Sequence, residues 1–211
     1  MSQQSAYPPP ERVRFSESEQ RLPWLSILMD AYLVTDQGIS EQIQREEKQG
    51  KKLACARGCA SCCQSHESIP VYPLELMGMS WYAIEILSGE LREQLKTRLS
   101  QLEEVNSCPF LVAGSCAIHP LRPMACRSFN VFNSPCAEGE DAYYTRREDV
   151  LTPIKKYQDE AFNVMLPFYG VNNKAERRRM IKTGAMHQMA KVMRELNWST
   201  LVDKMNAFDK S

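Results

Sequence analysis

Apolar residues recur at helical spacing along most of the chain outside its middle. The sequence places an apolar residue at every third position from Leu22 to Ala31, which predicts a helix over residues 18–34. Residues 40–53 are mostly charged, and Ser40 is a suitable N-cap. This second segment is expected to form a weakly amphipathic helix that leads the chain into its middle region.

The same periodicity predicts further helices downstream. They cover residues 74–87, 90–104, 148–166 and 174–206. The helix over 74–87 should be buried because it is broadly apolar, whereas the helix over 90–104 carries a narrower leucine stripe. The last helix would place Met186, Met189 and Met193 on one face together with Leu196. Such a methionine stripe is expected to pack in the core, with contact to a protein partner as the alternative.

All eight cysteines lie in the middle of the chain. They are Cys55, Cys59, Cys62, Cys63, Cys108, Cys116, Cys126 and Cys136. Cysteines used only as small buried apolar residues would be scattered, whereas clustering at short intervals is what a multi-thiolate metal site requires. The polar N-terminus lacks the apolar segment of a signal peptide, so we expect a cytosolic protein, where disulfides are uncommon. The thiols are therefore interpreted as metal ligands or redox groups.

The segment between residues 106 and 140 has no regular periodicity and is rich in Asn, Gly, Pro and Ser. No alternation of period two and no internal repeat is present. We therefore predict an all-α fold with helices packed around a loop-rich, metal-pinned cysteine-cluster centre. Residues 1–16 are expected to form a disordered lead, and residues 17–211 a single helical domain that contains the zinc- or iron-chelating region 55–136.

Thiolates favour zinc and iron, and a [4Fe-4S] cluster is one form in which iron binds. Two arrangements are open. One four-thiolate site could draw on both cysteine segments and leave surplus cysteines. Alternatively, two sites or a multinuclear site could form, with the adjacent Cys62 and Cys63 serving different metals because successive side chains diverge. His66 and His119 are outside candidates as ligands, whereas His187 is interpreted as a polar-face residue.

Several neighbours of the cysteines suit such a site. Gly58 permits a positive φ where the loop wraps its ligands. Arg122 and Arg127 flank Cys126 and could support anionic thiolates. For Arg57, support of the thiolates and simple exposure in a loop are equally open, whereas exposure is less expected for Arg127, which lies in a segment that looks packed.

Charge and hydropathy limit the partners. The chain has 26 basic and 26 acidic residues, which argues against a general binder of nucleic acid. The run Arg177–Arg179 is interpreted as a solvated helix face. No segment has the ~20 apolar residues of a membrane span. The expected partner is a metal ion, with neither nucleic acid nor membrane.

The cysteine blocks resemble those of the YkgJ-type cysteine-cluster family, described as zinc- or iron-chelating CxxxCxxCC proteins. The matching blocks are Cys55-x3-Cys59-x2-Cys62-Cys63, Cys108-Pro109-Phe110-Leu111, Cys116-Ala117-Ile118 and Arg122-Pro123-x2-Cys126-Arg127-x-Phe129. They cover residues 55–130 in one order. The resemblance implies metal chelation through these cysteines. The family is also similar to the longer flagellin lysine N-methylases.

Two functions follow from these observations. The first is a zinc- or iron-binding cysteine-cluster protein without a clear catalytic activity, whose metal is structural or is handled for transfer. The alternative is an iron–sulfur enzyme, for example a methyltransferase similar to a protein lysine N-methylase. The sequence offers no GxGxxG-like loop for methyl transfer and no evident general base or nucleophile.

Overall fold

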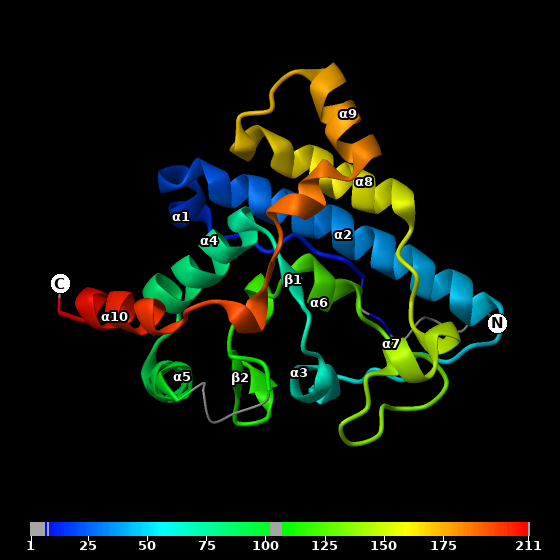
Figure 1. The fold of residues 1–211 in the computed structure, drawn as a ribbon, viewed down its shortest axis with the longest axis horizontal. Helices are drawn as coiled ribbons and strands as arrows, with labels where there is room; N and C mark the ends of the chain where they lie inside the picture. Colours follow the sequence, from blue (N-terminus) through cyan, green and yellow to red (C-terminus); the bar gives the residue numbers. More distant parts are fainter. Residues whose placement is uncertain (1–6, 8, 102–106, 211) are drawn as a thin grey trace.

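The computed structural model describes residues 7, 9–101 and 107–210, and it is mainly helical (Figure 1). The α-helices are α1 (Ser16–Arg21), α2 (Pro23–Lys48), α3 (Ser61–Ser65), α4 (Pro73–Trp81), α5 (Gly89–Ser100), α6 (Met124–Ser128), α7 (Ala142–Thr145), α8 (Lys155–Met165), α9 (Lys174–Thr183) and α10 (Ser199–Phe208). The helical fold class is thus confirmed in its coarse form. In the described part of the chain, no helix is both long and apolar enough to cross a membrane.

The prediction of an all-α fold needs one correction, because four two-residue strands pair in the structure. β1 (Pro70–Val71) pairs antiparallel with β4 (Lys191–Val192), and β2 (Leu111–Val112) pairs with β3 (Ser115–Cys116). Strands this short produce no detectable alternation of polar and apolar residues. The β2–β3 hairpin closes through Ala113 and Gly114, whose φ angles of 47° and 75° suit a type I′ turn.

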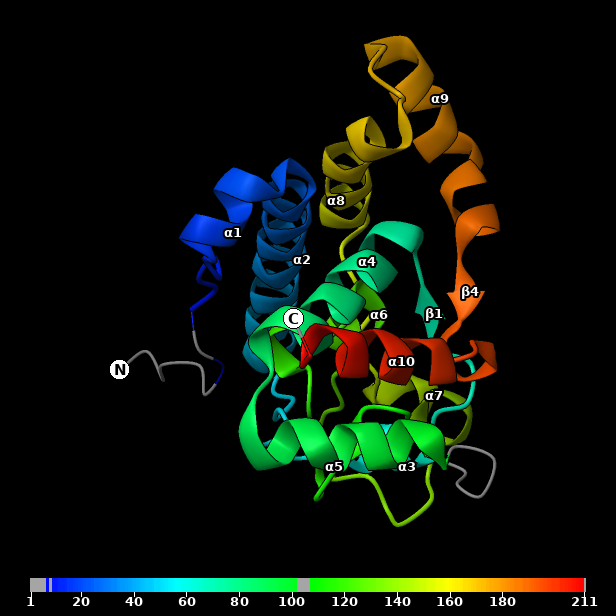
Figure 2. The ribbon, with the colours of Figure 1, turned by 90° about the vertical axis from the view of Figure 1, so that its left-hand side faces the viewer.

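The first two predicted helices are divided differently in the structure. Residues 16–21 form α1, and the 26-residue α2 runs without a break through the region where two helices were expected to meet. Gly38 does not interrupt α2, because α8 packs closely against it. A Cβ atom at Gly38 would lie 2.5 Å from the Cβ of Tyr157. Figures 1 and 2 show the resulting pair of helices, α2 and α8, side by side.

The next three predicted helices are present with different ends. The helix predicted over 74–87 is α4, which continues as one π-helical turn over Tyr82–Ile86. The helix predicted over 90–104 is α5, and its last predicted residues lie partly outside the described ones. The helix predicted over 148–166 begins only at Lys155, because Val150 forms an extended bridge with Val131.

The single helix predicted over residues 174–206 is wrong. α9 ends at Gly184, which adopts a left-handed conformation with φ 68°, and β4 and two 3-10 turns separate it from α10. Met186 and Met193 are buried as expected but in different places, and Met189 is only partly buried. Met186 packs in a cluster with α2 and α8, whereas Met193 packs in a cluster with α10.

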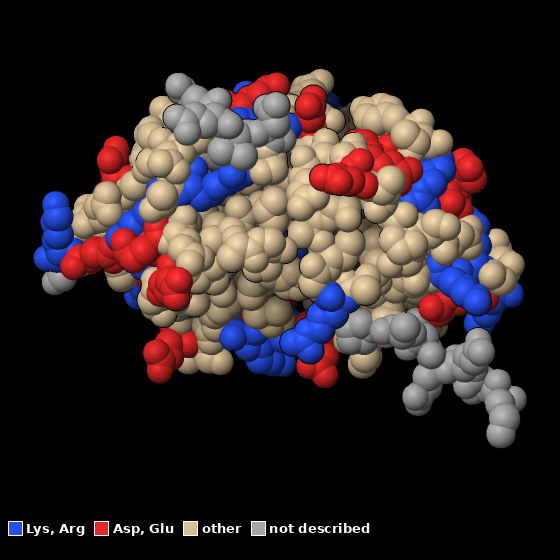
Figure 3. Space-filling model, turned by 90° about the horizontal axis from the view of Figure 1, so that it is seen from below, with Lys and Arg blue, Asp and Glu red and all other residues tan. Residues whose placement is uncertain are grey.

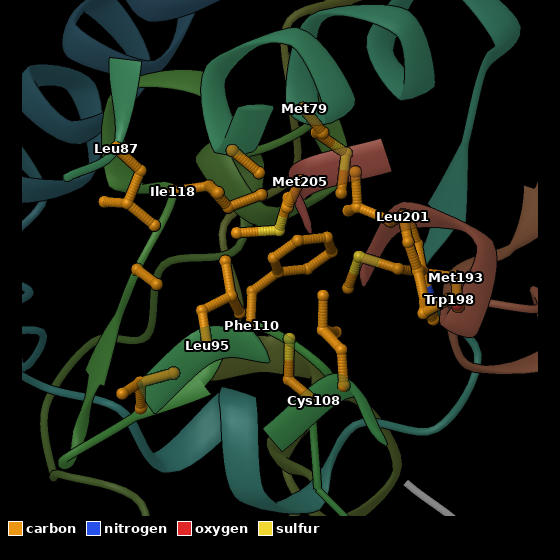
Figure 4. Close-up of a cluster of buried hydrophobic side chains, with 14 of the residues drawn as sticks. Met79, Leu87, Leu95, Cys108, Phe110, Ile118, Met193, Trp198, Leu201 and Met205 are labelled. Atoms are coloured by element: carbon orange, nitrogen blue, oxygen red, sulfur yellow. Dashed lines mark hydrogen bonds between the residues drawn. The ribbon is translucent and has the colours of Figure 1, made fainter. Parts of the chain in front are cut away.

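Two main hydrophobic clusters hold these elements together. The α2–α8 cluster contains Leu25, Leu28 and Met165, all nearly inaccessible to solvent. The Phe110 cluster lies beside it, and Figure 4 shows the Phe110 ring at its centre. Trp198 meets this ring edge-to-face at 4.8 Å between centroids. Aromatic pairs of this geometry add to the apolar burial of the core.

The chain enters the fold through specific contacts at its described N-terminal residues. The Arg12 guanidinium pairs with Glu19 at 2.7 Å and with Asp30 at 2.6 Å. The Phe15 ring packs edge-to-face on Trp81 at 5.0 Å. Residues 1–6 and 8, on which part of the predicted disordered lead falls, lie outside the described residues.

Candidate metal centre

The eight cysteines lie on short helices, a short strand and loops, not on the long helices. Cys55 and Cys59 lie in the loop before α3, and α3 itself holds Cys62 and Cys63. β3 ends at Cys116 and α6 carries Cys126, while the remaining two cysteines lie in coil. None of the eight takes part in a disulfide.

Backbone hydrogen bonds join the two cysteine segments. The Cys108 N–H donates to the Cys63 carbonyl at 2.7 Å, and the Ala54 N–H donates to the Val131 carbonyl at 2.8 Å. The Val131 N–H in turn donates to the Cys55 sulfur at 3.3 Å. Gly58 has φ 86°, so the positive φ expected there is present in the loop that carries Cys55 and Cys59. The fold therefore brings together cysteines that are more than 40 residues apart in sequence.

One set of thiols lies against the Phe110 cluster. We call Cys63, Cys108, Cys116 and Cys126 the inner thiol group. Cys108 is buried in the cluster, and Figure 4 shows its sulfur directed toward Phe110. The other three are partly buried and pack against the same cluster.

The inner thiols lie close enough together to raise the pKa of their neighbours. Hydrogen bonding to Cys108 is the main cause that raises the pKa of Cys63 to about 12, and the charge of Cys116 contributes. Burial raises the pKa of Cys126 well above its ordinary value, and the charges of Cys63 and Cys116 act in the same direction. A positive ion among these thiols would reverse this effect, because a bound metal stabilises thiolate.

The remaining cysteines form the outer thiol group: Cys55, Cys59, Cys62 and Cys136. Cys55 and Cys136 pack against a separate small cluster that contains Val131. Burial raises the pKa of Cys55 to about 11, with contributions from the charges of Cys59, Cys62 and Cys136. Cys59 is exposed, so this group opens to solvent.

Cys62 connects the two groups. Hydrogen bonding to Cys63 and then burial raise its pKa strongly. Its charge also contributes to the raised pKa values of Cys55 and Cys136 in the outer group and of Cys126 in the inner group. Both neighbouring side chains on α3 therefore act on inner thiols, and Cys62 acts on the outer thiols as well.

The arginines beside Cys126 differ in burial and contacts. Arg127 is buried, as the packed segment predicted, and its guanidinium pairs with Asp36 at 2.7 Å and lies 4.0 Å from the Tyr32 ring centroid. Arg122 is partly buried, and its charge lowers the pKa of Cys62, Cys116 and Cys126 against the effect of burial. Arg57 is exposed.

The structure also shows the face on which the cysteine segments lie. Seen from below, this face has a centre with few charged side chains, while lysines, arginines and acidic residues lie mainly around its margin (Figure 3). An uncharged centre suits a thiol-rich site, in which the metal and the arginines supply the compensating positive charge.

A match to a protein family shows to which family this chain is related. The family described as "CxxCxxCC: Putative zinc- or iron-chelating domain" matches residues 54–164, more than half of the chain. The chain belongs to this family. No curated protein and no solved structure matches it significantly.

The CxxCxxCC family match covers the whole metal centre. It begins one residue before Cys55, passes through all eight cysteines and ends in α8. All of α2 lies before the match, and α9 and α10 lie after it. The family assignment confirms the expected cysteine-cluster resemblance, and it supports zinc or iron as the metal.

The donor set fits such a metal, but its side chains are not arranged around one point. Among the described residues, no three His, Cys, Asp or Glu side chains stand together as a formed metal site. Eight free thiols in two coupled groups, with the Val131 N–H on the Cys55 sulfur, provide the ligand chemistry that zinc and iron prefer.

The histidines have other contacts. His66 Nε2 lies 3.2 Å from Asp141, and its ring packs edge-to-face on Phe129. Burial lowers the pKa of His66, and the Asp141 charge opposes this shift. His119 is exposed at the start of a 3-10 turn. His187 lies on another 3-10 turn, not on the helix predicted there, and hydrogen bonds to Tyr72 at 2.8 Å.

Sequence reasoning missed Asp36 and Glu75. Asp36 lies in α2, 91 residues before its partner Arg127, so no local spacing links them. Glu75 is fully buried and accepts the Met124 N–H at the start of α6 at 2.7 Å. Its position as one of two acidic residues in the apolar segment 74–87 was the only available signal for Glu75.

Proposed function

We propose that this chain is a metal-binding protein in which the inner and outer thiol groups each hold one zinc or iron ion. The observation that carries this proposal is that four thiols pack against the Phe110 cluster, whereas Cys55, Cys59 and Cys136 lie outside it and act on one another together with Cys62, which gives two sets of four. Each set supplies the four thiolates of a complete tetrahedral site. This is the second of the arrangements that the sequence left open.

The inner group is proposed to hold a structural ion. Cys108 is buried in the Phe110 cluster, and the other three inner cysteines pack against it. A metal held by these residues would join β3, α3 and α6 to the core. Because such a site is not formed in the unfolded chain, its binding free energy is folding free energy.

The outer group is proposed to hold a more exchangeable ion. Cys59 is exposed, and Cys136 lies in the coil between α6 and α7. Ligands on exposed loops can rotate toward an ion or release it without disturbing a core. This site therefore suits metal handling, whereas the inner site suits maintenance of the fold.

Metal content of single-cysteine variants tests this assignment. We choose Cys116→Ser for the inner group and Cys136→Ser for the outer group, with Ser134→Ala as a control outside both. Protein purified without oxygen should contain two ions per chain, each cysteine variant should lose one, and the control should keep both. The inner variant should also unfold at lower temperature, whereas the outer variant should not.

Two results would contradict the proposal. A single ion that is lost equally in both cysteine variants would show one shared site. Full metal content in either variant would remove that cysteine from the ligand set. Acid-labile sulfide measured on the same samples distinguishes single ions from an iron–sulfur cluster, since only the cluster contains sulfide in proportion to its iron.

A further inference from the structure

A cavity of about 330 Å³ lies on the opposite side of α6 from the thiols. α2 and α8 form one wall of the cavity. The other walls come from β1, α6 and the 3-10 turn Ala185–Met189. Figures 1 and 2 show α2 and α8 above α6 and β1 in this arrangement. On α6, Met124, Ala125 and Ser128 line the cavity, whereas Cys126 belongs to the inner thiol group. The volume is at the small end of the range typical for ligand pockets.

Aromatic rings form one end of this cavity. The Phe162 ring packs edge-to-face on Tyr72 at 5.2 Å and on His187 at 5.4 Å. Tyr157 lines the α8 wall, and its hydroxyl donates to Glu41 at 2.7 Å. Gly38 permits this close approach of α8 to α2, as described above. The rings are thus fixed in place by contacts to one another and to α2, so the cavity is already formed.

Three polar groups in the lining lack a protein partner. The Tyr72 hydroxyl bonds His187 Nδ1 at 2.8 Å. When this hydroxyl donates, the ring hydrogen of a neutral His187 lies on Nε2. Within the described part of the chain, His187 Nε2, the Ser128 hydroxyl and the Gln158 amide have no hydrogen-bond partner. His187 and Gln158 are exposed to solvent and Ser128 is partly buried, so all three groups are free to donate to or accept from a ligand in a mainly apolar lining.

The cavity contains no charge that would recognise an ionised ligand. None of the described residues that line it is Lys, Arg, Asp or Glu. A second hollow of about 280 Å³ shares Gln158, Phe162 and His187 with it and contains Lys155 and Asp159. These two side chains neutralise each other in an ion pair of 2.6 Å. Burying an ion in such a lining would be unfavourable, so an uncharged ligand is favoured.

We propose that this cavity binds a small neutral ring compound that carries one hydrogen-bond acceptor. The aromatic lining would enclose the ring, and His187 Nε2 would donate to the acceptor oxygen. This site is separate from the thiols, and it does not depend on the two-ion assignment above.

Binding of benzophenone to the purified full chain tests the proposal. Benzophenone is neutral and has one carbonyl acceptor, diphenylmethane lacks that acceptor, and 4-benzoylbenzoate adds a charge. Titration followed by amide NMR shifts should show saturable binding of benzophenone, about tenfold tighter than diphenylmethane, since one hydrogen bond contributes about that factor. The charged analogue should bind more weakly than benzophenone.

Variants locate the binding. Ala190→Phe fills the cavity and should abolish benzophenone binding, whereas Ala175→Phe on the exposed face of α9 should leave it unchanged. His187→Phe keeps an aromatic ring beside Phe162 and should reduce benzophenone affinity to that of diphenylmethane. Ile154→Trp is a second filling variant in case Ala190→Phe does not fold, which circular dichroism will show.

Clear outcomes would overturn the proposal. Absence of saturable benzophenone binding to the unmodified chain would reject the cavity as a site for such compounds. Unchanged binding in a folded filling variant would place the compound elsewhere. Unchanged preference for the carbonyl in His187→Phe would reject the recognition by Nε2. The same titration after removal of metal should give saturable binding, which separates this proposal from the metal assignment.

Discussion

Glu75 is a fully buried carboxyl group that joins the N-terminal ends of two helices. Its oxygens accept the Tyr72 N–H at 3.0 Å, before α4, and the Met124 N–H at 2.7 Å, in α6. Burial raises its pKa to about 7, while these two N–H groups and the charge of Arg127 oppose the shift. The carboxyl group is therefore half protonated near neutral pH.

The raised pKa of Glu75 predicts a pH-dependent stability. In the unfolded chain its pKa is near 4.5, so the folded state binds the proton more tightly. This contribution to folding is complete below pH 4.5 and is lost as the pH rises through 7, with a total of about 3 kcal/mol. Between pH 5 and 8, the free energy of unfolding of the unmodified chain should therefore fall by about 2 to 3 kcal/mol more than that of Glu75→Gln.

Urea unfolding at both pH values measures this difference. Glu17→Gln, at an exposed position of α1, is the matched control and should follow the unmodified chain. If Glu75→Gln shows the same pH dependence as the unmodified chain, the shifted pKa is contradicted.

The π-helical turn that follows α4 is held at its end by a side chain from α5. The π-helical turn Tyr82–Ile86 leaves backbone carbonyls at its end without helical partners. The buried Arg92 guanidinium donates to the carbonyls of Ile84 at 2.9 Å and Leu87 at 3.1 Å, and also to that of Met205 in α10 at 3.1 Å. One cation therefore completes the ends of two helices and fixes α5 between them.

Replacement of Arg92 should consequently destabilise the fold. Arg92→Met keeps much of the side-chain length but leaves several buried carbonyls unsatisfied, at a cost of about 3 kcal/mol. Denaturant unfolding should show a lower midpoint with an unchanged slope. Asp209→Asn, which weakens the partly exposed ion pairs with Arg92 and Lys96 but leaves the carbonyl bonds of Arg92 in place, should have a clearly smaller effect. Equal effects of the two variants would show that the ion pair, and not the carbonyl bonds, matters.

For the molecule as a whole, the sequence predicted the helices with strong periodicity and the position of the cysteine centre. It predicted one helix over 174–206, however, although Gly184 is a typical C-terminal signal after α9. Met186 and Met193 satisfy a helical spacing, yet their burial arises in two separate cores. Likewise, nothing local in the sequence indicates that Cys62 and Cys63 both act on Cys126, because this depends on contacts with a residue more than 60 positions away.

Removal of metal should affect one part of the molecule more than the other. Under the proposed function, a chelator releases the ion that joins the inner thiols to the Phe110 cluster. Amides of α3, the β2–β3 hairpin and α6 should then exchange with solvent faster, whereas those at the centre of the α2–α8 pair should keep their protection. Hydrogen exchange followed by mass spectrometry measures both regions in one experiment. Uniform loss of protection would show instead that the metal supports the entire fold, and no change would contradict a structural ion.

The position of α6 has a thermodynamic consequence. This helix has five residues, of which Cys126 lies among the thiols while Ala125 and Ser128 line the cavity. So short a helix cannot change on one side and remain unchanged on the other. If both proposed sites are occupied, the free energies of binding metal and ring compound must contain a common coupling term. By linkage, whatever factor the metal applies to the affinity for the compound, the compound applies to the affinity for the metal.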